Sequence, residues 1–176
     1  CIAPTKTFNL AGLQTAAVMV PDPVLRHKVW RGLNTDEVAE PNAFAITAAV
    51  AAFTEGGPWL DELRAYLAGN KRAVRATIDA YNASVDAARH VTLVEGDATY
   101  LLWLDCSTLT DDTERLCDHL LAEQRLMLSP GAQFGGNGRY FVRINAATQR
   151  ERVDEGTRRL TAGLRSFPWR HTESVT

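Results

Sequence analysis

The apolar positions along the chain change between helical spacing and short continuous runs, so the pattern predicts both helices and strands. From Trp59 to about Tyr81, apolar residues recur every three or four positions, which is typical of one long helix. Short apolar runs bounded by turn residues are typical of buried strands instead. We predict further helices over residues 23–33, 42–53, 112–125 and 148–164, and strands over residues 15–20, 91–94, 99–104, 126–128 and 140–144.

Polar residues at the expected helix starts support these boundaries. Asp22 precedes Pro23, and an acidic cap followed by proline at the first helical position is a common way for a helix to begin. Asp111 or Asp112 is expected to open a later helix, and Thr148 is expected to cap the last one.

The order of these elements indicates an α/β protein, because strands and helices follow one another along the chain. No internal repeat or low-complexity segment interrupts the order. We predict the end of a larger domain over residues 1–58, a long connecting helix over 59–82, a small compact α/β domain over 83–168 and a frayed tail over 169–176.

Composition and charge exclude several classes of protein. With 45% hydrophobic and 23% charged residues the chain is an ordinary globular sequence, and its net charge of -2 offers no basic surface for nucleic acid or for a membrane. No apolar run is long enough to span a bilayer. Cys1, Cys106 and Cys117 lack the spacing of metal ligands, so we expect reduced thiols in a cytoplasmic protein and no metal site.

The common motifs of metal and nucleotide sites are absent. There is no HExxH, CxxC, GxGxxG or GxxxxGK[ST] string, and the four histidines are scattered. The glycine-rich segment 135–138 has two interpretations, a phosphate cradle or a turn that links two strands. The turn is favoured, because no helix is expected to begin directly after it.

Two cations stand apart from this ordinary background. Lys6 lies in a loop between apolar residues, where it is either a surface lysine or a nucleophile that is held still and shielded from water. Arg143 lies inside the apolar strand YFVRIN, where a cation is costly to bury unless it is paired. Arg143 therefore forms an internal salt bridge or binds an anion, and an amino-acid carboxylate fits its planar fork.

Five short sequence segments make the chain similar to a known enzyme family. PTKTFNLAGLQ resembles the cofactor-lysine segment of fold type I pyridoxal-phosphate enzymes, in the class I/II aminotransferase superfamily, and is most similar to the cystathionine β-lyase/C–S lyase branch. The similarity continues, in the family's order, through EPNAFAITAAVAAFTEGGPWLDEL, EGDATYLLWLDC, LSPGAQFG and GRYFVRINAA. It covers nearly the whole chain.

This resemblance implies a fold, a cofactor and the roles of three residues. The chain would hold the C-terminal end of the large pyridoxal 5'-phosphate-binding domain and the small α/β domain. Lys6 would carry the cofactor in a covalent link and act as catalytic base, and Thr5 would help to bind the cofactor. Arg143 would bind the carboxylate of the substrate. Burial of Lys6 among Pro4, Phe8 and Leu10 is expected to keep its amine partly neutral.

The chain also departs from the wider superfamily. Gln14 stands where many relatives have a phosphate-binding arginine, and Ala3 stands where many have a serine. Family members are about twice as long as this chain. We therefore expect it to be the C-terminal part of an enzyme whose N-terminal half supplies the rest of the cofactor site, and to be inactive alone.

The implied reaction is an α,β-elimination that releases a thiol from a cysteine S-conjugate such as cystathionine. The alternatives are an aminotransferase on the same scaffold and a folded fragment without activity that only associates with itself. Expected partners are an amino-acid substrate, a second copy in a homodimer and the missing N-terminal half, with neither nucleic acid nor membrane.

Overall fold

The computed structural model describes residues 1–168, and the predicted tail at 169–176 lies outside the described residues. The chain divides into two compact units, Cys1–Ala65 and Tyr66–Thr176, and the division falls within the long helix α3 (Gly57–Asn82). Each unit is considered by itself below.

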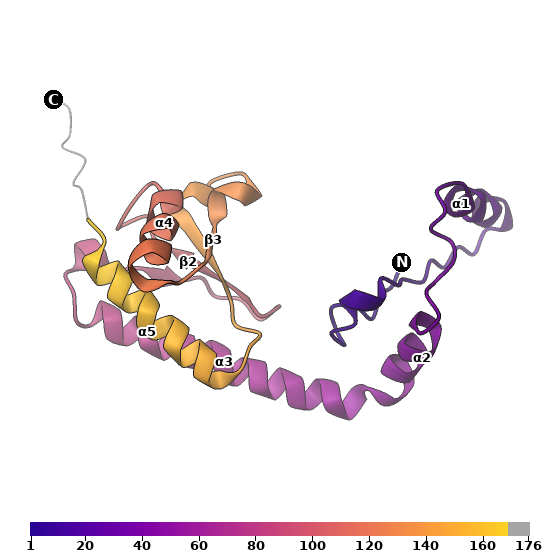
Figure 1. Ribbon diagram of the computed structural model, residues 1–176, viewed down its shortest axis with the longest axis horizontal. Helices are drawn as coiled ribbons and strands as arrows, with labels where there is room; N and C mark the ends of the chain where they lie inside the picture. Colours follow the sequence, from indigo (N-terminus) through magenta and orange to yellow (C-terminus); the bar gives the residue numbers. More distant parts are fainter. Residues whose placement is uncertain (169–176) are drawn as a thin grey trace. The chain divides into compact units, whose positions relative to one another are not determined.

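The first unit is helical (Figure 1). It contains the short 3-10 helix η1 (Ala11–Leu13), α1 (Pro23–Thr35), α2 (Ala45–Glu55) and the start of α3. The predicted start of α1 is confirmed, because the carboxylate of Asp22 accepts a hydrogen bond from the backbone N–H of Leu25 at 2.6 Å.

The strand predicted over residues 15–20 is wrong. Ala17 exchanges two backbone hydrogen bonds with Ile2, at 2.8 and 2.9 Å, and this isolated bridge does not continue into a ladder. Met19 is 72% exposed. The apolar run has the composition of a strand, but a strand also needs a neighbour along its length, and the described residues supply one only at Ile2.

The second unit contains a four-stranded antiparallel sheet with the strand order β1-β2-β4-β3. The sequence correctly predicts that a sheet and further helices follow the long helix. The elements are the rest of α3, η2 (Ala87–Arg89), β1 (Thr92–Leu93), β2 (Leu101–Asp105), α4 (Thr113–Gln124), β3 (Ser129–Pro130), η3 (Gly131–Phe134), η4 (Gly138–Tyr140), β4 (Phe141–Asn145) and α5 (Arg150–Ser166).

One face of this sheet forms the core. Alternate residues of β2 and β4 are buried, so that Leu104 and Val142 point to the same side, as the two-residue period of a strand requires. They join buried residues of α3, α4 and α5, among them Ile78, Leu120 and Leu160, in a single cluster. The opposite face of β4 carries Arg143, and this alternation decides which side chains are available for a site.

Three local predictions in this unit need correction. The short strand expected over residues 126–128 begins later, at Ser129, because hydrogen bonding to β4 starts only there, and Met127 is 81% exposed. Thr148 is not the cap of α5, since Gln149 occupies that position and makes no side-chain capping bond. The sequence also predicts a glycine-rich loop over residues 129–138, and the structure instead places β3, η3 and the start of η4 there.

Within residues 1–168, no helix combines the length and the apolar character needed to cross a membrane.

Candidate active site

Lys6 lies in a tightly folded loop at the start of the first unit. The backbone N–H of Phe8 donates to the carbonyl oxygen of Pro4 and that of Leu10 donates to Thr5, both at 2.9 Å. Between them Asn9 takes a left-handed conformation with φ of 55°, which asparagine tolerates better than most residues. The peptide around Lys6 is therefore fixed by its own backbone hydrogen bonds.

Aromatic packing anchors this loop within the first unit. The ring of Phe8 lies 5.7 Å from Phe53 of α2, edge to face, and 6.3 Å from Trp59 of α3, stacked. Gly56 makes the approach possible, since a Cβ atom at that position would lie 2.6 Å from Cε1 of Phe8. The loop position of Lys6 thus depends on residues about 50 positions away in the sequence.

Asn42 forms a second anchor. Its side-chain amide donates to the carbonyl oxygen of Leu13, at the end of the Lys6 segment. Its Oδ1 atom accepts the backbone N–H of Phe44 at 3.0 Å, just before α2. The strings PTKTFNLAGL and EPNAF, which are separate in sequence, meet here.

The side chain of Lys6 is exposed, so the expected shielding among Pro4, Phe8 and Leu10 is wrong for this structure. The physical reason is that Phe8 directs its ring to Phe53 and Trp59. Among the described residues, no carboxylate lies within 4.0 Å of the Lys6 amine and no hydrogen bond engages it. Thr5, next to it, is half-buried. Lys6 is an accessible primary amine on a fixed loop.

Ala3 and Gln14, the two positions at which the chain departs from the superfamily, are both exposed. Gln14 ends η1 in a left-handed conformation with φ of 48°.

Arg143 lies on β4 in the second unit and is half-buried. Its Nη2 atom donates to Oγ of Ser129 on β3 at 3.3 Å, and its Cζ atom lies 4.3 Å from the ring centroid of Phe134. No carboxylate in residues 1–168 lies within 4.0 Å of the guanidinium. Of the two interpretations of this arginine, the internal salt bridge is therefore not formed among the described residues.

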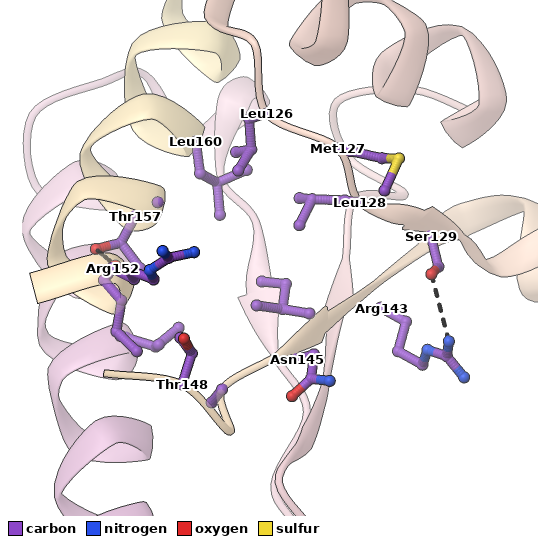
Figure 2. Close-up of a pocket in the computed structure, with 15 residues that line it drawn as sticks. Leu126, Met127, Leu128, Ser129, Arg143, Asn145, Thr148, Arg152, Thr157 and Leu160 are labelled. Carbon is purple, nitrogen blue, oxygen red and sulfur yellow. Dashed lines mark hydrogen bonds between the residues drawn. The ribbon is translucent and has the colours of Figure 1, made fainter. Parts of the chain in front are cut away.

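A cavity of about 290 Å³ lies beside this strand, bounded by residues 126–129, residues 143–146 and the first turns of α5. Figure 2 shows Arg143 at one margin, with its guanidinium directed to Ser129, and Arg152 of α5 at another. Both charged residues of the lining are arginines, and the rest of the lining is mainly aliphatic. The lining of this cavity, as described, therefore carries positive charge from two arginines and contains no acidic side chain.

The glycine-rich loop joins β3 to β4, as the turn interpretation predicts. Gly135 and Gly136 have φ of 79° and 59°, a conformation that glycine adopts without strain. Sequence reasoning did not identify Ser129 or Phe134 as neighbours of Arg143. The signal that was available is the close spacing of glycines around Phe134, which indicates a loop of defined shape.

Among residues 1–168, no three His, Cys, Asp or Glu side chains gather to hold a metal ion. His119 instead makes a hydrogen bond of 2.9 Å to Oγ of Ser166. His171 lies outside the described residues.

Comparison with known proteins gives a family and a consistent set of relatives. The family model described as Aminotransferase class I and II matches residues 4–160. The chain is 38% identical over 164 residues to Cystathionine beta-lyase PatB of Bacillus subtilis, covering 93% of this chain and 41% of that protein. It is 32% identical over 163 residues to Protein MalY of Escherichia coli, covering 92% and 40%.

The structural comparison agrees. The crystal structure of a PLP-bound C-S lyase from Staphylococcus hominis, complexed with the inhibitor L-cycloserine, matches with a TM-score of 0.74 and 26% identity. The match covers 92% of this chain and 37% of that one. The chain spans about two fifths of the length of the relatives it matches.

Proposed function

The chain belongs to the aminotransferase class I and II family, and we propose on that basis that it is part of a pyridoxal-phosphate-dependent C–S β-lyase. The substrate would be a cysteine S-conjugate such as cystathionine. The observation that carries this proposal is the accessible amine of Lys6 on a loop fixed by Phe8 and Asn42, in the segment that is most similar to the lyase branch. The name of the PatB relative supports the choice of reaction.

The residues present fit the cofactor at its point of attachment. The aldehyde group of the cofactor would condense with a primary amine that is not held in an ion pair with a carboxylate. Among the described residues, Lys6 has such an amine. Thr5 adds a hydroxyl beside it, and we propose that this hydroxyl contacts the cofactor. When bound, pyridoxal phosphate delocalises the electron pair left on the substrate's Cα and so makes its proton removable.

In the proposed reaction Arg143 and Lys6 have separate roles toward the substrate. Arg143 holds the α-carboxylate through its forked donors, which fixes the orientation of the bonds at Cα. Lys6 accepts the Cα proton as general base. The Cβ–S bond breaks with its electron pair going to sulfur, and the thiolate takes up a proton. The remaining three-carbon unit reacts with water to give pyruvate and ammonia.

An aminotransferase reaction is the second candidate, because the matched family is described by that activity. In that case Lys6 would return the proton to a different carbon and the Cβ–S bond would stay intact. The two reactions differ in their requirement for a second substrate, since only the aminotransferase needs an α-keto acid acceptor.

We further propose that the intact protein is a cytoplasmic homodimer. The first unit exposes large apolar side chains on α2 and before it, including Phe44, Ile46 and Val50, as surfaces that associate commonly do. The domain assignment also stays a proposal: residues 1–58 would complete a large cofactor-binding domain and residues 83–168 would form the small domain.

Borohydride reduction of the intact enzyme tests the proposed function. This chain contributes three lysines, Lys6, Lys28 and Lys71, to the intact enzyme, and mass spectrometry of the digested protein identifies which lysine peptide carries the reduced cofactor. We expect the reduced cofactor on the Lys6 peptide, pyruvate release from cystathionine without added keto acid, and loss of that release by several orders of magnitude in Lys6→Ala. Lys28→Ala is the matched control and should retain activity. Labelling of another lysine, or pyruvate release by Lys6→Ala at the original rate, would contradict the proposal.

A further inference from the structure

We propose that Phe134 is a positioning residue that holds the guanidinium of Arg143 in one orientation for carboxylate binding. The glycine loop between β3 and β4 would then serve to keep Phe134 in place. The proposal rests on the carboxylate-binding role proposed for Arg143, and it assigns a purpose to the loop residues 131–138.

The contacts of Arg143 leave little freedom to its guanidinium. Phe134 lies under it, with 4.3 Å from Cζ to the ring centroid, a distance typical of a cation–π contact. Ser129 accepts one hydrogen bond from Nη2 at 3.3 Å. A guanidinium has five N–H donors, so these two contacts orient it and leave donors for a bidentate carboxylate.

Phe134 is itself held from a second side. Trp103 is the cross-strand partner of Arg143 in the β2–β4 pair. Its ring lies edge to face against Phe134 at 5.3 Å and against Phe141 at 6.1 Å. Phe134 remains 46% exposed. Its ring therefore bridges Trp103 and Arg143 at the surface and is not part of the buried core.

Two glycines determine where Phe134 can lie. A Cβ atom on Gly131 would lie 2.7 Å from the carbonyl oxygen of Phe141 and would collide with that of Gly138, and a Cβ atom on Gly138 would collide with the carbonyl oxygen of Gly131. The two 3-10 helices η3 and η4 thus approach closely because both positions lack a side chain. Phe134 ends η3, and its ring lies against Arg143 of β4.

The 176-residue chain allows a direct test by NMR. The Nε–H signal of Arg143 is assigned by its disappearance in Arg143→Lys. The ring of Phe134 should shift this signal, so Phe134→Leu should move it toward the value of an exposed arginine, and Phe134→Tyr should preserve it. Phe44→Leu, a change at an exposed ring of the first unit, is the control and should leave it unchanged. An unmoved signal in Phe134→Leu would overturn the proposal.

Binding measurements on the intact enzyme test the consequence. Propionate carries a carboxylate and propionamide does not, so Phe134→Leu should weaken inhibition by propionate about two- to fivefold and leave propionamide unchanged. KM for cystathionine should rise by the same factor while kcat stays close to the original, and Phe134→Tyr should restore both. Equal inhibition of Phe134→Leu and the original enzyme by propionate would overturn the proposal. If Arg143→Ala also leaves propionate inhibition unchanged, the carboxylate role of Arg143 fails instead, whatever the NMR result.

Discussion

The side-chain amide of Asn70 donates a hydrogen bond to the carbonyl oxygen of Ala146 at 2.9 Å, and a second one to Thr148, also at 2.9 Å. Asn70 is completely buried on α3, and residues 146–148 connect β4 to α5. The preceding residue on the helix supports the same junction, because the carbonyl oxygen of Gly69 accepts a hydrogen bond from Arg150 at 2.9 Å. Asn70 and its neighbour Gly69 on α3 thus hold the chain directly after the strand that carries Arg143.

Asn70→Ala should therefore destabilise the second unit. The buried carbonyl oxygen of Ala146 and the half-buried one of Thr148 would both lose their donor, and the loss at the buried oxygen costs about 1–3 kcal/mol in the free energy of unfolding. Urea unfolding of the 176-residue chain measures the change. Gln133→Ala, which alters an exposed amide of the same unit, should stay within about 0.5 kcal/mol of the original. Equal stability of the Asn70 and Gln133 variants would show that the junction is held by other contacts.

Arg143→Ala should raise KM for the amino-acid substrate of the intact enzyme. Removal of one partner of a desolvated charge pair costs about 2–5 kcal/mol of binding. Absorbance of the cofactor should persist, because its attachment is assigned to Lys6. Arg139→Ala is the control, since Arg139 is exposed and contacts Tyr140. An unchanged KM in a folded Arg143→Ala protein would assign Arg143 to structure.

The three cysteines should differ sharply in reactivity. Burial raises the pKa of the Cys106 thiol, and burial together with the neighbouring acidic residues Asp118 and Glu114 raises the pKa of Cys117 to about 12. The thiolate is the reactive form, so at pH 8 Cys117 should react about a thousandfold more slowly than a thiol with its ordinary pKa of 9.0. Cys1 is exposed and should take up iodoacetamide first. Mass spectrometry should find one label on the folded chain and three after unfolding in guanidinium; rapid labelling of Cys106 in the folded chain would contradict the burial.

Glu155 should keep its charge to an unusually low pH. Hydrogen bonds from Arg158 and Arg159, each with a 2.7 Å contact, lower the pKa of Glu155 from 4.5 to about 2. Because its pKa is lowered in the folded chain, its contribution to stability is present above pH 4.5 and is lost as the pH falls toward 2. The contribution is small, since the side chain is 43% exposed and screened by water.

A carboxyl NMR titration checks this value, and Arg159→Gln should move the midpoint of Glu155 upward. The unfolding curve of Glu155→Gln should lose part of its dependence on pH between 4.5 and 2. Glu123→Gln changes an exposed carboxylate on α4 and is the control. A Glu155 midpoint near 4.5 in the original chain would rule out the two ion pairs in solution.

Sequence alone was sufficient for features that depend on neighbouring residues. The start of α1 follows from Asp22 and Pro23. The start of α4 follows from the pair Asp111 and Asp112, of which Asp112 accepts the N–H of Arg115 at 3.1 Å. The length of α3 follows from its apolar spacing, because a helix closes its hydrogen bonds within four residues. The resemblance of five strings, in order, was sufficient for the family and for the choice of Lys6 and Arg143 as the residues to examine.

Features that depend on distant residues were decided only by the tertiary structure. Residues 15–20 and 126–128 have strand composition, yet strands form only where a neighbour supplies hydrogen bonds, and β4 supplies them from Ser129 onward. The sequence did not decide whether Arg143 forms a salt bridge or binds an anion. Its neighbours are distant in sequence: Ser129 is brought to it by the pairing of β3 with β4, and Phe134 by the glycine-rich loop. Lys6 was expected to be buried by the apolar residues beside it, but Phe8 packs on Phe53 and Trp59. Side-chain environment is set by contacts between distant segments, and local sequence pattern does not specify them.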